Sequence, residues 1–362
     1  VSGLDQALQG RAAGVTVTSS SGQPGEGATI RIRGIGSALG GNDPLYVVDG
    51  VITGDIKWLS PTDIKSMEIL KDASAAAIYG SRGANGVILI TTKSGGKGKA
   101  NVTFDAYWGL QNRWKKLDLM GSKEMAETKL RIGTMRDGAA EIAYYNQNGF
   151  NEWMSVYNLG TSKYFPVPMT IAHPDGLDYS SINTDWQDEV FHPNAFMHNY
   201  NLSVDGGGEK GHYAFSASYF GQEGTIIGSD YQRFTLRLNS DVQLFKWLTI
   251  GEHLSFVHSS GRNAMNNSSS PGASVISAAL AMAPWDPTHY PEGSVNAQGE
   301  DISGRTAASS NFKNVTNPFS MVNESYPLDK TNRWVGDIYL EIKPVEGLTI
   351  RPSISMDTYL TN

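Results

Sequence analysis

The sequence predicts a mixed α/β unit over residues 1–97, followed over residues 98–362 by part of an antiparallel transmembrane β-barrel. The first unit is rich in glycine and combines short strand patterns with short helix patterns. From residue 101 onwards, apolar and polar side chains alternate over long segments. The connections between these segments alternate long and short, which is typical of outer-membrane barrels.

Short elements account for the first unit. We expect one helix over 4–13 and another over 73–79, each followed by a glycine that ends it. The Asp49-Gly50 pair predicts a two-residue hairpin turn, and turn formation explains it better than a functional site does. The expected strands are 15–18, 29–33, 45–48, 51–52, 67–70 and 86–92.

Seven longer strands are predicted in the second unit. In the segment 233–244, for example, every even position except Ser240 is apolar, and every odd position is polar or charged. A strand that spans a membrane needs about 9–11 residues, whereas a strand in a globular protein has about 5–6. These lengths favour a membrane barrel over a large soluble β-domain, which is the alternative. The seven segments are 101–111, 196–205, 212–220, 233–244, 247–258, 333–343 and 348–360.

The connections support the same interpretation. Two are long, 112–195 and 259–332, and we expect both on the extracellular side, because outer-membrane barrels have short periplasmic turns and longer outer loops. A barrel must close so that no strand edge meets lipid, and seven strands that end at an open edge leave it unclosed. The residues therefore predict a piece of a larger barrel.

Composition excludes several classes of protein. The chain of 362 residues carries 29 Lys+Arg and 36 Asp+Glu, so its formal charge of -7 argues against a nucleic-acid partner bound through phosphates. It has no cysteine for a disulfide scaffold or a thiolate-ligated metal. No apolar run approaches the roughly 20 residues of a membrane helix; the best candidate, 275–283, is about half as long.

Ordered motifs run through the first unit and continue into the second. Together they resemble the SusC/RagA family of TonB-dependent outer-membrane transporters, with residues 1–97 similar to that family's plug domain. In the second unit, NTDWQDEV at 183–190, HNYNLSVDGG at 198–207 and LAMAPWDP at 280–287 carry the likeness. In the first unit it is carried by LQGRAAGV (8–15), SGQPGEG (21–27), IRIRG (30–34), DPLYVVDG (43–50), ILKDASAAAIYGSRGANG (69–86) and VILITTK (87–93).

The resemblance implies a fold and a location. A barrel of 22 strands would hold the plug in its lumen, and this chain would supply the plug and about the first seven strands. The family's small N-terminal domain and its TonB-contacting segment would precede Val1. The protein would lie in the lipid bilayer of the outer membrane of a Gram-negative, Bacteroidota-like cell, with its long loops outside.

The resemblance also implies active import of large nutrients, oligosaccharides or peptides. The TonB–ExbB–ExbD complex would energise transport, and a SusD-like surface lipoprotein would be a partner. The alternative is a non-transporting barrel scaffold or docking component of a larger outer-membrane assembly. No catalytic, cofactor or metal site is predicted; the glycines at 34, 36 and 40 do not have the G-x-G-x-x-G spacing of a phosphate loop.

Two sets of residues are candidates for function. Arg31, Arg33 and Arg82 could pair with barrel carboxylates and hold the plug until force releases it, or they could be ordinary exposed arginines. Five aromatic residues of the long connections are candidates for cargo contact, and the alternative is that they stiffen the loops. These five are Trp114, Trp153, Tyr157, Trp285 and Tyr290.

Overall fold

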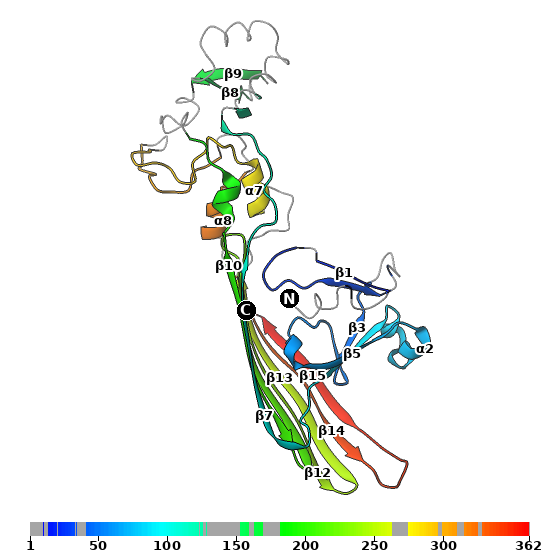
Figure 1. Ribbon diagram of the computed structural model, residues 1–362. Coiled ribbons are helices and arrows are strands. Elements are labelled where there is room, and N and C mark those ends of the chain that lie inside the picture. Colours follow the sequence, from blue (N-terminus) through cyan, green and yellow to red (C-terminus); the bar gives the residue numbers. More distant parts are fainter. Residues whose placement is uncertain are drawn as a thin grey trace.

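A long curved sheet and a smaller domain beside it make up most of the structure (Figure 1). The computed structural model describes residues 10, 14–19, 21–32, 34, 41–122, 124–125, 128, 153–158, 163–168, 182–262, 274–295, 299–309, 315–324 and 328–361. Within 153–158 and 163–168 only the backbone is described. The predicted helix over 4–13 therefore lies almost entirely outside the described residues.

The large sheet contains seven antiparallel strands in the order β15-β14-β13-β12-β11-β10-β7. All seven predicted segments form strands, which confirms the predicted antiparallel sheet. Strand β15 begins five residues later than predicted, after Pro352, which has no N–H to donate to a ladder. The strands are β7 Gly98–Gln111, β10 Ala195–Gly207, β11 Gly211–Glu223, β12 Asp230–Phe245, β13 Leu248–Arg262, β14 Leu328–Ile342 and β15 Ser353–Thr361.

The two faces of this sheet have opposite character. On β12 the even-numbered Leu238 is 39% exposed, whereas the odd-numbered Arg237 and Asn239 are 5% and 3% exposed. Residues paired across neighbouring strands share a face of the sheet. Leu238 of β12 pairs with Leu254 of β13, which pairs with Gly336 of β14, so all three lie on one face. Apolar side chains exposed on one face and polar side chains buried on the other are the reverse of a soluble sheet. We call these the outer face and the inner face.

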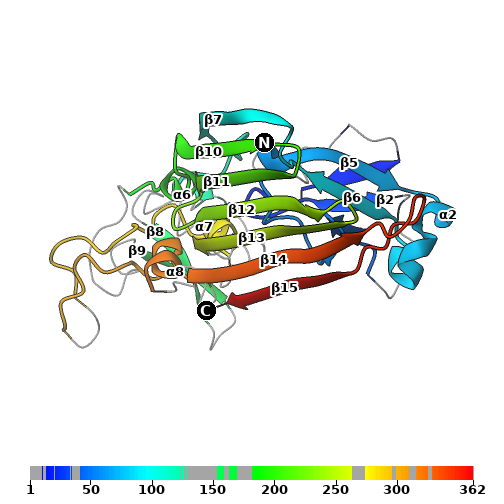
Figure 2. The ribbon, with the colours of Figure 1, turned by 90° about the horizontal axis from the view of Figure 1, so that it is seen from below.

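The small domain lies against the inner face and has its own sheet. This sheet has the order β4-β3-β6-β5, with β3 and β6 parallel, and a separate hairpin joins β1 to β2. Figure 2 shows the domain on one side of the large sheet. Its strands are β1 Val15–Thr18, β2 Thr29–Ile32, β3 Leu45–Val48, β4 Val51–Thr53, β5 Ile64–Leu70 and β6 Val87–Thr92.

The apolar core of the small domain extends to the large sheet. Ile88 and Ile90 of β6 are almost fully buried in a cluster that also includes Val257 of β13 and Val335 of β14.

Asp49 and Gly50 form the predicted turn between β3 and β4, with φ of 50° and 93°. The predicted helix at 73–79 is shorter: α2 spans Ala73–Ala76 and passes into the 3-10 helix η2, Ala77–Gly83. A second 3-10 helix, η1, spans Pro61–Asp63.

The long connections gather at one end of the sheet, here called the loop end; the short hairpins form the opposite hairpin end (Figure 1). At the loop end, α6 Trp186–Val190, α7 Val275–Ala281 and α8 Pro318–Glu324 enclose a separate apolar cluster. A hairpin of β8 Trp153–Asn158 and β9 Lys163–Pro168 lies beyond them. Among the described helices, none is long and apolar enough to cross a bilayer.

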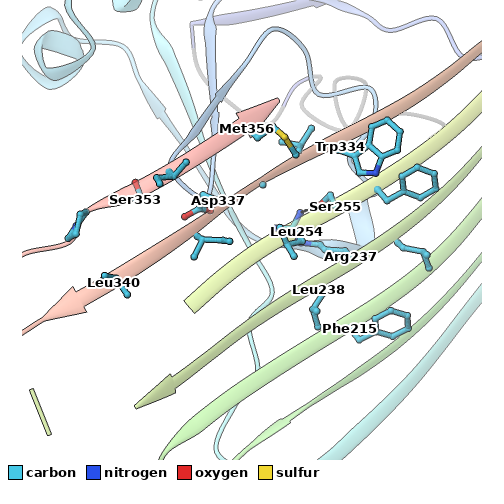
Figure 3. A pocket seen from close by; sticks show the side chains of 17 residues that line it. Phe215, Arg237, Leu238, Leu254, Ser255, Trp334, Asp337, Leu340, Ser353 and Met356 are labelled. Carbon is cyan, nitrogen blue, oxygen red and sulfur yellow. Dashed lines mark hydrogen bonds between the residues drawn. The ribbon is translucent and has the colours of Figure 1, made fainter. Parts of the chain in front are cut away.

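The outer face carries aromatic side chains toward both ends of its strands. Trp108 and Tyr200 meet edge to face toward the loop end, and Phe245 and Trp247 stack at the hairpin end. Aromatic side chains near both ends of lipid-facing strands are typical of a membrane-spanning sheet. A groove of about 730 Å³ interrupts this face around Gly336, between Leu254 and Met356 (Figure 3).

Candidate functional site

Beside the apolar packing of Val257 and Val335, the contact between the small domain and the inner face has a polar part that centres on Arg237 of β12. Its guanidinium pairs with the carboxylate of Asp49 and donates to Thr92 Oγ1 at 2.6 Å and to Ser255 Oγ at 3.1 Å. The side chains of Arg237 and Asp49 are each only 6% exposed. Asp49 also accepts bonds from the Thr92 backbone N–H at 2.9 Å and hydroxyl at 2.7 Å. The turn aspartate is thus part of a buried network that joins two strands of the small domain to the sheet.

Other inner-face residues of β12 extend this network along the strand. Asn239 donates to Thr92 Oγ1 and to the backbone carbonyl of Lys93, both at 2.8 Å. Arg233 donates to the backbone carbonyl of Lys57. Because side chains alternate along a strand, residues 233, 237 and 239 reach the same side.

Arg333 of β14 makes a second anchor. Its Nη1 lies 2.8 Å from Asp55 Oδ2 and its Nη2 lies 2.7 Å from Thr53 Oγ1, both in the small domain. The same guanidinium also pairs with Asp357 of β15 at 2.8 Å and lies over the ring of Trp58. We call the bonds of Arg233, Arg237, Asn239 and Arg333 to the small domain the docking contacts.

The docking contacts cost more to break at one partner than to separate as a whole. Removing one partner of a buried ion pair costs about 3–5 kcal/mol, because the other charge stays buried and unpaired. When both partners separate into water, each is rehydrated, and the net cost of a typical hydrogen bond is only about 0.5–1.5 kcal/mol. A polar interface of this kind is therefore sensitive to loss of one partner, while its separation into water costs comparatively little.

Asp63 of η1 lies at the border of this interface beside a cavity of about 230 Å³. The residue is 4% exposed, and its Oδ2 has no hydrogen-bond partner. Burial raises the pKa of its carboxyl group, against a hydrogen bond from Ser216 and the positive charge of Arg237, which lower it. The charged carboxylate is therefore costly in the docked state.

The Asp63→Asn variant should dock more firmly at neutral pH. The pKa of Asp63 in the docked state lies above the ordinary value of 3.8. Its contribution to docking is therefore greatest below pH 3.8, where the carboxyl group is protonated in both states, and is lost as pH rises through the docked-state pKa. The neutral amide removes this loss, so the two proteins should differ at neutral pH and converge in acid. Hydrogen exchange of the small domain of the full-length protein at several pH values measures this; a wild-type protein that docks more firmly at neutral pH than the variant would contradict it.

The arginines predicted from the sequence lie elsewhere. Arg31 is half-buried on β2, Arg82 is exposed at the end of η2, and Arg33 lies outside the described residues. The docking contacts have the opposite polarity to the predicted pairing, because the arginines come from the sheet and the carboxylates Asp49 and Asp55 come from the small domain. The interpretation of Asp49 as turn chemistry alone is also incomplete. The signal that sequence reasoning missed was a pair of arginines, 233 and 237, on the polar side of a strand.

The aromatic candidates at the loop end differ in their surroundings. Trp285 is 1% exposed, so its ring packs inside the loops, which favours the alternative, loop stiffening; its contact with cargo stays a prediction. Tyr290 is half-buried, and its hydroxyl accepts a bond from the Ala308 N–H at 3.1 Å. Trp114 is 98% exposed. Trp153 and Tyr157 lie on β8, where only the backbone is described.

Two motifs about 100 residues apart meet at the loop end. Trp186 of α6 donates its indole N–H to the carbonyl of Ala283 at 2.9 Å, and the Thr184 N–H donates to Pro284 O at 2.6 Å. The nearby carboxylate of Asp188 lies 2.6 Å from Lys116 Nζ and also pairs with Arg113. These hydrogen bonds, from Lys116 first and then Arg113, lower the pKa of Asp188. The carboxylate of Asp188 thus ties the segment that follows β7 to helix α6.

We expect Trp186→Ala to loosen the loop end without undocking the small domain. Truncating a buried tryptophan costs about 3–5 kcal/mol, and here the carbonyl of Ala283 also loses its donor. Limited proteolysis should then cut the long connections much faster than in the wild type. Trp114→Ala is the matched control, because its exposed ring should leave cleavage unchanged; equal cleavage of the two variants would contradict the packing role of Trp186.

Known proteins resemble the chain in sequence. Residues 1–87 match the family described as "TonB-dependent Receptor Plug Domain". The chain is 34% identical to "TonB-dependent receptor P26" of Formosa agariphila, an alignment that covers 99% of this chain and 32% of that protein. It is 31% identical to "TonB-dependent receptor SusC" of Bacteroides thetaiotaomicron, over 93% of this chain and 31% of that protein. The chain thus spans about a third of the length of these curated relatives.

Solved structures share the fold. The structure described as the "RagAB peptide importer in the 'closed-closed' state" superimposes with a TM-score of 0.74 at 26% identity, over 100% of this chain and 39% of that one. A second, "Structure of the RagAB peptide transporter", gives a TM-score of 0.75 at 24% identity, over 100% of this chain and 40% of that one. The small domain and the seven-stranded sheet are therefore arranged as in those proteins.

Proposed function

We propose that this chain, which belongs to the SusC/RagA-like TonB-dependent receptors, supplies the plug and one wall of an outer-membrane importer of large nutrients. Residues 1–97 would form the plug, and residues 98–362 would form the first barrel strands, with 112–195 and 259–332 as extracellular loops. The plug would close the lumen at rest and move when the transporter is energised.

The docking contacts are the observation that carries this proposal. The face of the small domain that meets the sheet is held by buried arginines, and the opposite face of the same sheet is apolar and exposed. A plug that must separate from the inner face and return needs hydrogen bonds that water can replace. An entirely apolar contact of equal area would resist separation more, because exposing apolar surface to water costs about 25 cal/mol per Å².

The relatives support the partners that we propose. Two solved neighbours are described as the RagAB peptide transporter and the RagAB peptide importer. For this chain we propose a SusD-like surface lipoprotein over the loop end and the TonB–ExbB–ExbD complex on the periplasmic side. Oligosaccharides and peptides are both candidate cargo.

Whole-cell uptake tests the proposal. Cells that carry the full-length receptor would be given fluorescent tryptic peptides and, separately, fluorescent malto-oligosaccharides, with and without a tonB deletion. We expect TonB-dependent uptake of one of the two probes. The alternative, a non-transporting scaffold, predicts that uptake is the same in both strains while assembly with neighbouring envelope proteins depends on the receptor.

A further inference from the structure

Two neighbouring strands interrupt the apolar pattern of the outer face at the same level. Ser240 is the polar exception among the even positions of β12 from 234 to 244. It pairs with Glu252 of β13, so the two side chains lie next to each other on the outer face. An ionisable side chain on the lipid-facing side of a membrane sheet is rare and costs free energy. The Ser240–Glu252 pair therefore points to a partner within the bilayer.

The carboxylate of Glu252 has room for more hydrogen bonds than the protein gives it. The residue is half-buried, and Ser240 Oγ donates one hydrogen bond to it. A carboxylate offers about four acceptor positions. Within the described part of the chain, no lysine, arginine or histidine pairs with this carboxylate. Lipid tails bring no hydrogen-bond donor, so the partner that suits Glu252 is a cation that carries N–H groups.

A groove lies beside this pair. It is the groove of about 730 Å³ on the outer face, and Ile338, which pairs with Glu252, lines it together with Leu254 (Figure 3). The groove passes Gly336, where an added Cβ would overlap the backbone carbonyl oxygen of His253. The gap in the apolar row is therefore built into the backbone. Strands β13 and β14 each have a described strand on both sides, so this part of the groove does not depend on where the sheet ends.

The length of the groove matches one lipid chain. On β14 the groove is lined from Trp334 to Leu340. Six residue steps span about 20 Å along a strand, or about 15 Å across the bilayer at a tilt of about 40°. One leaflet supplies half of a hydrocarbon core that is about 30 Å thick. The outer-face side chains that line the groove are apolar, so an extended acyl chain fits it in both length and chemistry.

Glu252 lies toward the hairpin end of this groove. It is level with Ile338, and Leu340 is the next outer-face residue of β14 in the direction of the hairpins. In outer-membrane barrels the short hairpins face the periplasm. The lipid that has its headgroup near Glu252 and its chain in the groove therefore belongs to the periplasmic leaflet.

We propose that one phospholipid of the periplasmic leaflet binds here, with an acyl chain in the groove and an ethanolamine headgroup whose ammonium donates hydrogen bonds to Glu252. A choline headgroup carries the same charge but has no N–H group, so the site selects ethanolamine over choline. This lipid site goes beyond the proposed import function. It requires that the outer face meets lipid, and it depends neither on the cargo nor on TonB.

Native mass spectrometry of the full-length receptor, purified from the outer membrane, measures the headgroup selection. The receptor would be mixed with equal amounts of dioleoyl phosphatidylethanolamine and dioleoyl phosphatidylcholine. We expect the first bound lipid to be the ethanolamine lipid about threefold to fivefold more often. Glu252→Gln keeps the shape of the side chain and an acceptor for Ser240, and it should bind the two lipids equally. Glu341→Gln is the matched control: it removes the same charge from the inner face of β14, where Glu341 pairs with Lys343, and should keep the preference.

Bimane fluorescence locates the acyl chain, because this chain has no cysteine of its own. Leu238→Cys and Leu202→Cys are matched positions: both leucines lie on the outer face, 39% and 42% exposed, and of the two Leu238 lines the groove. In vesicles, ethanolamine lipid with brominated chains should quench bimane at 238 about twofold more than brominated choline lipid does. The two lipids should quench bimane at 202 equally. Adding Glu252→Gln should abolish the difference at 238.

Several results would overturn the lipid site. These are an equal choice of the two lipids by the wild type, an unchanged choice in Glu252→Gln, or an equal loss of preference in Glu341→Gln. Equal quenching by the two lipids at 238 would place the chain outside the groove and would overturn the site too. TonB-dependent uptake tests the proposed function separately, so failure of one leaves the other standing.

Discussion

Arg237→Met is expected to weaken plug docking by about 3–5 kcal/mol, because it leaves the carboxylate of Asp49 buried without its partner. Methionine keeps most of the volume of the arginine stem, so the effect reports charge and hydrogen bonding more than packing. Amide hydrogens of β3, β4 and β6 in the full-length receptor should then exchange about 10²–10⁴-fold faster than in the wild type. Hydrogen exchange read by mass spectrometry measures this directly.

Two further variants make this result specific. Arg262→Met on the same sheet removes an ion pair with Asp230 whose side chains are 46% and 30% exposed, and it should cost less than about 1 kcal/mol. Combining Arg237→Met with Asp49→Asn removes both charges and should recover part of the loss; asparagine also tolerates the positive φ of this turn. Equal effects of Arg237→Met and Arg262→Met would show that the buried pair does not hold the plug.

Leu238 follows Arg237 on β12 and points to the outer face of the sheet. We expect Leu238→Arg to destabilise the receptor in the membrane. An arginine on the lipid-facing side of a barrel costs about 2–4 kcal/mol near the bilayer midplane and about 0–1 kcal/mol near the interfaces. Leu238 lies in the apolar band, whereas Leu244 lies beside Phe245 at the hairpin end. We therefore expect Leu238→Arg to lower the unfolding free energy in lipid vesicles much more than Leu244→Arg.

Guanidinium titration of the vesicle-bound receptor measures this difference. Leu238→Met is the control for loss of the native side chain and should change the unfolding free energy by less than about 1.5 kcal/mol. If Leu238→Arg and Leu244→Arg were equally mild, the even-numbered side chains of β12 would not face hydrocarbon.

The alternation of side chains was enough to predict the large sheet. In 233–244 the two faces differ at nearly every position, and a shift of one residue would exchange them, so strand identity and facing follow from the sequence alone. The three loop-end helices were not predicted. Helices α6, α7 and α8 have five to seven residues each, too few to be stable alone, and contacts such as Trp186 with Ala283 hold them from about 100 positions away.

The site was harder to predict than the fold for a similar reason. Periodicity shows that Arg233 and Arg237 share the polar face, but it does not show which residue of the plug lies opposite. Arg31 was a reasonable candidate on alternation alone. The network around Asp49 and Thr92 emerges only once the parallel pairing of β3 with β6 brings these two residues together opposite Arg237. Pairing across two domains is not a local property of sequence.

Spin labels along β12 test most directly whether the polar face of this sheet holds the plug while the apolar face meets lipid. Single labels would be placed at each position from 234 to 241 of the full-length receptor in bilayers, and their collision rates with oxygen and with a water-soluble nickel chelate would be compared. The account predicts high oxygen collision at the apolar even positions such as Leu236 and Leu238, and low collision with both reagents at odd positions such as Thr235 and Asn239. The reverse alternation, or high nickel collision at the even positions, would contradict it.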